Sequence, residues 1–220
     1  TVEFLDLNRK DGMRVYQRSV TFLMIAAIDN ISPKIKVRIN HHINGGYFCE
    51  LENDNDLTED LMWKIKEEMN RLVALNIPIV KKSYKLDTAL RIFDEHKMFD
   101  KKSLFEYRRS SWVNIYELDR TQGYFYGYMV PSTSYLEKFE IVSYNNGFVL
   151  KFPDEKNPTV ISPFVPEPKL SRVFRESEQW ARIMEVDTVG ALNNVISKGN
   201  IRDLILISEA LHEKKIAQIA

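Results

Sequence analysis

The first 50 residues contain the pattern that most constrains the fold. Apolar residues recur at helical spacing between Arg18 and Ile28, which predicts a helix with an apolar face. Beyond it, Ile35, Val37 and Ile39 alternate with lysine and arginine, and a Gly-Gly turn leads to a second strand-like segment. Such alternation is typical of a strand with one buried side. Because the helix needs a sheet to cover it, the pattern predicts an α+β fold.

The rest of the chain divides at a proline-rich stretch. Before it, helical and strand-like segments alternate, with Thr58 expected as a helix N-cap and strands expected at 2–7, 112–118, 124–130, 139–144 and 148–152. Residues 153–168 hold five of the eight prolines, and only helical patterns follow, one of them with Asp187 as its expected cap. We therefore predict an antiparallel sheet packed by helices over 1–152, a linker over 153–168 and a small all-helical bracket over 169–220.

Composition limits the class of protein. The 220 residues carry 31 basic and 31 acidic side chains, so no net charge favours a nucleic-acid or membrane partner. No apolar run approaches the roughly 20 residues of a membrane span. The single cysteine, Cys49, excludes an internal disulfide and is compatible with a reducing compartment. We expect a cytoplasmic protein with no membrane partner, and because both ends interrupt apolar patterns, we expect a piece of a longer chain.

Three features in the first 145 or so residues resemble the second N-terminal domain of threonyl-tRNA synthetase, the editing domain. They are the helix that begins near Arg18, the helix start near Thr58, and the turn and strand formed by Ile43, Asn44, Gly46, Tyr47, Phe48 and Glu50. The resemblance implies a His-x-x-x-His pair on the central helix and a Cys-x-x-x-His pair on a later segment. In this sequence the first pair falls on Arg18 and Phe22, and the second, aligned through Val130-Pro131, falls on Phe125 and Met129.

None of these four residues is an ordinary transition-metal ligand or a general base near neutral pH. We therefore expect the fold without the editing reaction, with no catalytic residue, metal or cofactor in this fragment. Phe22, Phe125 and Met129 would make the cleft apolar, and Arg18 would suit a phosphate or carboxylate, as in a small nucleotide. The alternative is that the three apolar residues are ordinary core and Arg18 is solvated or paired.

Two further groups admit a functional interpretation. His41 and His42 lie near Cys49 and suggest a metal site, but neighbours on a strand point to opposite faces, and a buried thiol is the simpler interpretation of Cys49. The aromatic run from Gly123 to Pro131 could stack nucleobases. Because few basic residues surround it in the sequence, a half-buried strand is the simpler interpretation.

A second resemblance covers nearly the whole chain. Four stretches, Tyr124–Ile141, Asn157–Ile161, Val189–Gly199 and Ser208–Ala220, resemble the N-terminal half of a bacterial multidomain nucleoside kinase of the uridine kinase type. It implies a non-catalytic accessory or regulatory region whose partner is its own C-terminal kinase domain, where ATP and Mg²⁺ would bind. The chain itself contains no P-loop motif. The alternatives are a module that binds RNA or a nucleotide, which the neutral charge makes less favoured, and a residual hydrolase of mischarged aminoacyl-tRNA.

Overall fold

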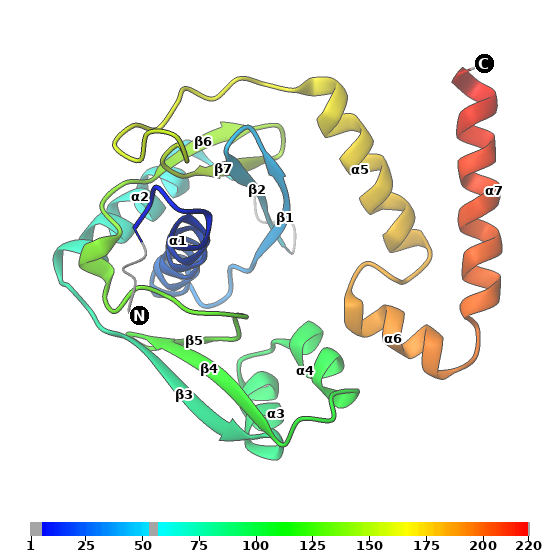
Figure 1. Ribbon diagram of the computed structural model, residues 1–220, viewed down its shortest axis with the longest axis horizontal. Helices are drawn as coiled ribbons and strands as arrows, with labels where there is room; N and C mark the ends of the chain where they lie inside the picture. Colours follow the sequence, from blue (N-terminus) through cyan, green and yellow to red (C-terminus); the bar gives the residue numbers. More distant parts are fainter. Residues whose placement is uncertain (1–5, 53–56, 220) are drawn as a thin grey trace. The chain divides into compact units, whose positions relative to one another are not determined.

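The chain forms two compact units. The structure, a computed structural model, describes residues 6–52 and 57–219 (Figure 1). The first unit contains the described residues up to Ser83 together with Asn114–Pro168, and the second contains Tyr84–Val113 and the residues from Lys169 onward. Most of the strand expected at 2–7 lies outside the described residues. The domain limits expected from the sequence stay a prediction.

Helix α1 (Lys10–Ile31) is the centre of the first unit. The six consecutive residues from Ser19 to Met24 are all buried, so the middle of the helix is covered on every side. Figure 1 shows α1 almost end-on, with strands and another helix placed around it. The sequence predicts one apolar face on this helix. The buried surface in the structure extends around the whole helix, because the chain wraps around it instead of packing on one side.

Two sheets enclose α1. Each neighbouring pair of strands in the first sheet is antiparallel, and its order is β1 (Val37–Ile43), β2 (Gly46–Leu51), β7 (Gly147–Lys151) and β6 (Glu140–Tyr144). The second sheet has the order β3 (Ile79–Lys85), β4 (Trp112–Leu118) and β5 (Thr121–Gly123), in which β4 and β5 are antiparallel. The expected α+β fold of antiparallel strands packed by helices is confirmed.

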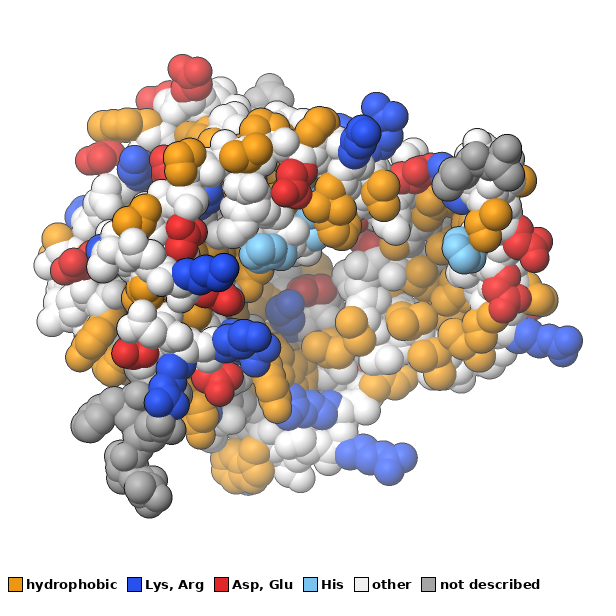
Figure 2. Space-filling view, turned by 45° about the horizontal axis from the view of Figure 1, so that its top comes forward, with side chains coloured by type: hydrophobic (Ala, Val, Ile, Leu, Met, Phe, Trp, Pro, Cys, Tyr) orange, Lys and Arg blue, Asp and Glu red, His pale blue; other side chains and the backbone are white. Residues whose placement is uncertain are grey.

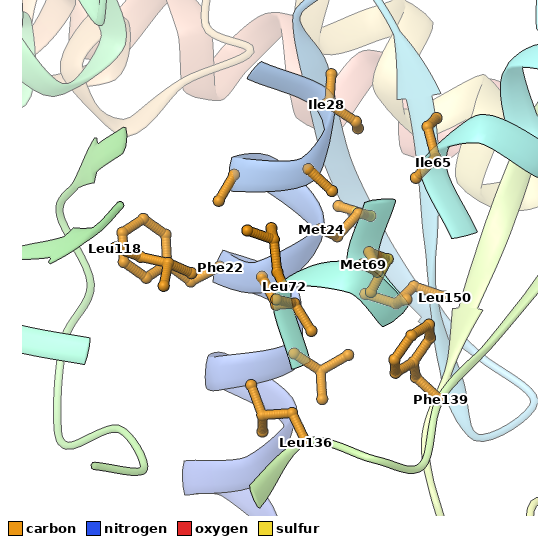
Figure 3. Packing of buried hydrophobic residues seen from close by; sticks show 14 of the residues in the cluster. Phe22, Met24, Ile28, Ile65, Met69, Leu72, Leu118, Leu136, Phe139 and Leu150 are labelled. Atoms are coloured by element: carbon orange, nitrogen blue, oxygen red, sulfur yellow. The ribbon is translucent and has the colours of Figure 1, made fainter. Parts of the chain in front are cut away.

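Helix α2 (Glu59–Ala74) completes the cover of α1. It begins where the sequence predicts, because the Thr58 side chain accepts a hydrogen bond from the Leu61 backbone N–H at 3.1 Å. Ile65, Met69 and Leu72 on its inner face are fully buried in the main hydrophobic core. Figure 3 shows Met69 near Met24 of α1, while Phe22 and Leu118 lie on the opposite side of that helix. One core therefore surrounds α1.

The prediction of a strand at 124–130 is wrong. Strand β5 ends at Gly123, and the residues up to Val130 follow an irregular path. Gly127 has a φ of +104°, which interrupts an extended strand. The carbonyl oxygens of Gly127 and Tyr128 accept hydrogen bonds from the side chains of Tyr116 and Arg18. The two side chains supply hydrogen bonds that a neighbouring strand would otherwise supply. The segment is therefore a loop bound to α1 through Arg18.

The proline-rich residues 153–168 pack on the first sheet. The buried ammonium of Lys151 donates a hydrogen bond to the carbonyl of Ser162. The rings of Tyr144 and Phe164 meet edge to face with centroids 4.9 Å apart, and the Val165 N–H donates to the Asn44 side chain at 3.1 Å. These contacts hold the segment against β6 and β7 although it contains no helix or strand before Pro168.

The second unit is helical. Its helices are α3 (Leu86–Glu95), α4 (Phe99–Glu106), α5 (Pro168–Ile183), α6 (Val189–Ser197) and α7 (Ile201–Ile219). Helix α6 packs closely on α4, because a Cβ at Gly190 would lie only 2.8 Å from Ser103. The cap of α6 is Thr188, whose side chain accepts from the Ala191 N–H, and the expectation for Asp187 is wrong by one residue. No helix in the described part of the chain is long and apolar enough to cross a membrane.

Candidate functional site

The four positions singled out by the editing-domain resemblance meet in the first unit. Arg18 and Phe22 lie one turn apart on α1, and Phe125 and Met129 belong to the loop of residues 124–130. The rings of Phe22 and Phe125 have centroids 5.2 Å apart. One Arg18 guanidinium nitrogen donates to the carbonyl of Tyr128 at 2.5 Å, next to Met129 in the chain. Residues more than 100 positions apart are therefore brought to one place.

The loop is attached to α1 through hydrogen bonds on neighbouring residues. Besides the contact from Arg18, the Val130 N–H donates to Ser19 Oγ at 3.0 Å, and Ser19 in turn donates to the Val15 carbonyl at 2.7 Å. Gly127 allows this approach, since a Cβ there would lie 2.9 Å from the Arg18 guanidinium. The helix and the loop therefore form one preorganised surface.

A tyrosine behind the loop completes the network. Tyr116 of β4 donates its hydroxyl to the Gly127 carbonyl at 2.5 Å. Burial raises the pKa of Tyr116, and the nearby charge of Arg18 opposes this shift. The phenol therefore stays protonated near neutral pH and keeps its donor role. Two successive loop carbonyls are occupied, one by a neutral phenol and one by a guanidinium.

The inner half of the site is filled with side chains. Phe22 is fully buried, Phe125 and Met129 are partly buried against the same core, and a Cβ on Gly123 would lie 3.0 Å from both phenyl rings. These residues do not fit a metal ion, and no group of three or more His, Cys, Asp or Glu that could hold one occurs among the described residues. This half offers neither a metal-bound water nor a general base.

The outer half is aromatic and cationic. The side chains of Tyr126 and Tyr128 are among the most exposed large side chains described, at 84% and 73%. The ammonium of Lys81, from β3, lies 4.6 Å from the centre of the Tyr128 ring, which is a cation–π distance. Sequence reasoning identified the aromatic run but missed Lys81. In the sequence, Lys81 is visible only as one of two adjacent lysines far from the aromatic run. Its contact with Tyr128 arises only in the folded chain.

The histidine and cysteine candidates do not form a metal site. His41 packs on Phe48 with ring centroids 5.3 Å apart, whereas His42 meets the edge of Tyr47 at 5.9 Å. Cys49 is a buried free thiol. The two histidines therefore contact different rings.

A polar pocket of about 400 Å³ lies at the C-terminal end of α1. Asn30 donates to Glu68 at 2.8 Å, and Arg71 donates to the same carboxylate at 2.7 Å, which lowers the pKa of Glu68. Arg120 donates to the Asn30 side chain at 2.8 Å and to its backbone carbonyl at 2.9 Å. Because terminal helix carbonyls lack partners within the helix, this network serves to close α1.

Comparison with known proteins finds similarity to threonine–tRNA ligases. No protein-family model matches the chain. A threonine–tRNA ligase of Bacillus velezensis is 31% identical over 147 residues, which cover 64% of this chain and 22% of the relative. Threonine–tRNA ligase 1 of Bacillus subtilis is 30% identical over 148 residues, covering 65% and 22%. A Thermoplasma volcanium threonine–tRNA ligase is 26% identical over 175 residues, covering 79% and 26%.

These similarities support an editing-domain-like region of the threonyl-tRNA synthetase kind, as the first resemblance implies. They give no support to the nucleoside kinase resemblance. The chain spans about a fifth to a quarter of the length of these relatives.

Proposed function

We propose that the first unit is a non-hydrolytic binding module that takes a nucleotide or an unpaired RNA end on the surface of Tyr126, Tyr128, Lys81 and Arg18. The observation that carries this proposal is the exposed pair of tyrosine rings beside two cations, on a loop fixed to α1. Exposed aromatic rings stack on nucleobases of any sequence, and lysine or arginine nearby attracts the phosphates. The relatives are threonine–tRNA ligases, and a tRNA fits a ligand of this class.

This proposal reverses the order of preference drawn from the sequence. A module for RNA or a nucleotide was the less favoured alternative because the chain has no net charge. The fold brings Lys81 to the aromatic loop, so the local charge differs from the average charge. The similarity to threonine–tRNA ligases also favours a ligand related to RNA over a purely structural role.

Hydrolysis of a mischarged aminoacyl-tRNA is the function that the chemistry of the site opposes. An ester hydrolase needs a group that activates water, such as a metal ion or a base. The inner positions hold two phenylalanines and a methionine, and the guanidinium of Arg18 carries only hydrogen-bond donors. We expect the purified chain to leave mischarged threonine-specific tRNA intact at the uncatalysed rate. Accelerated release of the amino acid would contradict this part of the proposal.

Binding is tested with a labelled single-stranded RNA and with uridine monophosphate as probes. Tyr126→Ala removes an exposed ring that makes no part of the core, and loss of one stacked base is worth about 1–3 kcal/mol, or roughly 5- to 150-fold in Kd. Tyr135→Ala is the matched control, because that ring is also exposed, at 61%, but lies outside the loop. The proposal fails if the unmodified chain binds neither probe or if both substitutions weaken binding equally.

We further propose that such a module serves as an accessory region of a nucleoside kinase. Its support is the sequence resemblance over the four stretches named above, and the relatives found by comparison add none. In that setting ATP and Mg²⁺ would belong to a kinase domain outside this chain, and a nucleotide on the aromatic loop would regulate it. The test is uridine phosphorylation by the full-length protein with and without residues 1–220. Unchanged rate, KM and nucleotide inhibition would remove the regulatory role.

A further inference from the structure

Arg18 acts not only on the aromatic loop but also on a tyrosine of the first sheet, Tyr47 of β2. Burial raises the pKa of Tyr47, and the positive charges of Arg18 and Arg14 oppose this shift. Arg14 lies one turn before Arg18 on α1, so both side chains extend from the same face of the helix. Two guanidinium groups therefore lie close to one phenol, and one of them also donates to the Tyr128 carbonyl.

The ring of Tyr47 is held in place by its neighbours. It meets the buried ring of Phe152 edge to face with centroids 5.1 Å apart, and the ring of His42 at 5.9 Å. His42 is opposite Tyr47 in the register of β1 and β2, and its side chain is exposed. The Tyr47 hydroxyl donates to Gln17 Oε1 at 3.4 Å, which is long for a hydrogen bond between oxygens. The polar end of Tyr47 and the imidazole of His42 are therefore available to a ligand.

The positive charge of this group is poorly balanced. Arg18 forms no ion pair with any residue that the structure describes. Within the described part of the chain, Arg14 pairs with Asp11 alone, at 3.4 Å, and the two side chains are 69% and 72% exposed. An ion pair this exposed contributes little, so Arg14 can exchange Asp11 for a stronger anion. On the face shown in Figure 2, lysine and arginine side chains lie near histidine side chains.

The number and kind of donors favour a terminal phosphate. A phosphate monoester carries a charge of about −1.5 to −2 near neutral pH, and its three free oxygens are strong hydrogen-bond acceptors. Guanidinium groups bind phosphate through pairs of parallel N–H donors, and an imidazole on the facing strand can reach a further oxygen. A carboxylate or a phosphodiester has a smaller charge and fewer free oxygens. It would therefore satisfy fewer of these groups.

We propose that Arg14, Arg18 and His42 form a subsite for a phosphate monoester, and that the ligand of the aromatic loop is a nucleotide with a terminal phosphate. This assignment rests on the proposed function of the loop, since it names the group that extends from a base stacked there. Arg18 joins the two halves of the site, because it contacts the loop and also lies near Tyr47.

The experiment is calorimetric titration of the 220-residue chain with uridine, uridine monophosphate and inorganic phosphate. Uridine monophosphate should bind about tenfold more tightly than uridine, because its phosphate adds charge-assisted hydrogen bonds. Inorganic phosphate should compete with the nucleotide and leave uridine binding unchanged. Arg14→Gln should raise the Kd of the nucleotide roughly fivefold and leave that of uridine unchanged. Lys34→Gln is the matched control, because it removes one exposed positive charge beyond the opposite end of α1, and it should change neither Kd.

Two further variants separate phosphate binding from damage to the fold. Asp11→Asn removes the acid that competes for Arg14 and should lower the Kd of uridine monophosphate about twofold. His42→Phe keeps a ring beside Tyr47 but removes the N–H donor, and should raise that Kd about threefold. A disturbed fold would weaken the binding of uridine as well, and it would not produce a gain in Asp11→Asn.

The subsite and the stacking loop fail in different ways. Equal binding of uridine and uridine monophosphate would overturn the subsite, and so would an equal loss of both ligands in Arg14→Gln, while the loop keeps its role if Tyr126→Ala still weakens uridine binding. A 5′-phosphorylated oligouridylate should bind better than the same oligomer with a 5′-hydroxyl. Equal binding of the two oligomers would show that a phosphodiester is sufficient and would overturn the assigned monoester. A chain that binds none of these ligands would contradict the proposed function as well.

Discussion

The thiol of Cys49 makes the fold depend on alkaline pH in a way that can be measured. Cys49 lies on β2 opposite Ile39 of β1 and Phe148 of β7, and its side chain is completely buried. Burial raises the pKa of this thiol from its ordinary value of 9.0 to about 12, against a smaller opposing effect of the Leu150 backbone. The folded protein therefore keeps a neutral thiol at a pH where the unfolded chain carries a thiolate.

The direction and size of the effect follow from linkage. Since the pKa is higher in the folded state, the stabilising contribution is complete below about pH 9 and is lost as the pH rises from about 9 to about 12. At about pH 10, roughly ten in eleven unfolded chains have an ionised thiol, which favours unfolding by about 1.4 kcal/mol. At about pH 8 the same quantity is below about 0.1 kcal/mol.

The assay compares urea unfolding of the original chain and of Cys49→Ala at about pH 8 and about pH 10. The variant should be less stable at the lower pH, because it loses buried volume. The difference in unfolding free energy between the two proteins should shrink by about 1.4 kcal/mol at the higher pH, since tyrosine and lysine titrate in both. A difference that is the same at both pH values would refute the assigned burial. So would rapid reaction of the native thiol with a thiol reagent near neutral pH.

Three further substitutions test the packing. Thr58→Ala removes the side-chain acceptor for Leu61 and should cost about 1 kcal/mol in urea unfolding, with Thr58→Ser retaining most of it. Gly190→Val forces a side chain into Ser103 and should destabilise the second unit by about 1–3 kcal/mol; an unchanged unfolding midpoint would contradict the close packing. Phe22→Ala empties a fully buried position and should cost about 3–5 kcal/mol, and a loss below about 1 kcal/mol would show that this residue lines an open cleft instead.

Local patterns in the sequence were sufficient for much of the fold. The strand at Trp112–Leu118 is confirmed, and it depends only on local alternation. The cap at Thr58 is confirmed as well, because its side chain contacts a backbone group only three residues away. The hairpin turn before Gly147 is confirmed for the same reason, since Asn145 adopts a positive φ of 53°. The expected cap at Asp187 failed only by one residue, where two suitable side chains stand next to each other.

The contacts that shape the candidate site could not be predicted in this way. Alternating aromatic residues at 124–130 fit a strand, but the partners of this segment are Tyr116 and Arg18, whose proximity exists only after the chain has wrapped around α1. The cation–π contact of Lys81 with Tyr128 likewise joins two segments about 50 residues apart. Periodicity predicts whether a side chain is buried or exposed. It does not predict which distant residue that side chain contacts.

The proposed binding surface and the positions singled out by the editing-domain resemblance belong to different side chains of the site. Phe22 is buried in the core and Phe125 packs against it, so two of the positions singled out by the editing-domain resemblance contribute to stability. Tyr126 and Tyr128 come from the same loop but face solvent. The hydrogen bonds from Arg18 and Tyr116 to the carbonyls of Tyr128 and Gly127 fix the loop backbone that carries both outer rings. The proposed recognition therefore depends on the outer rings of the loop, whereas the inner positions on α1 and the loop contribute packing.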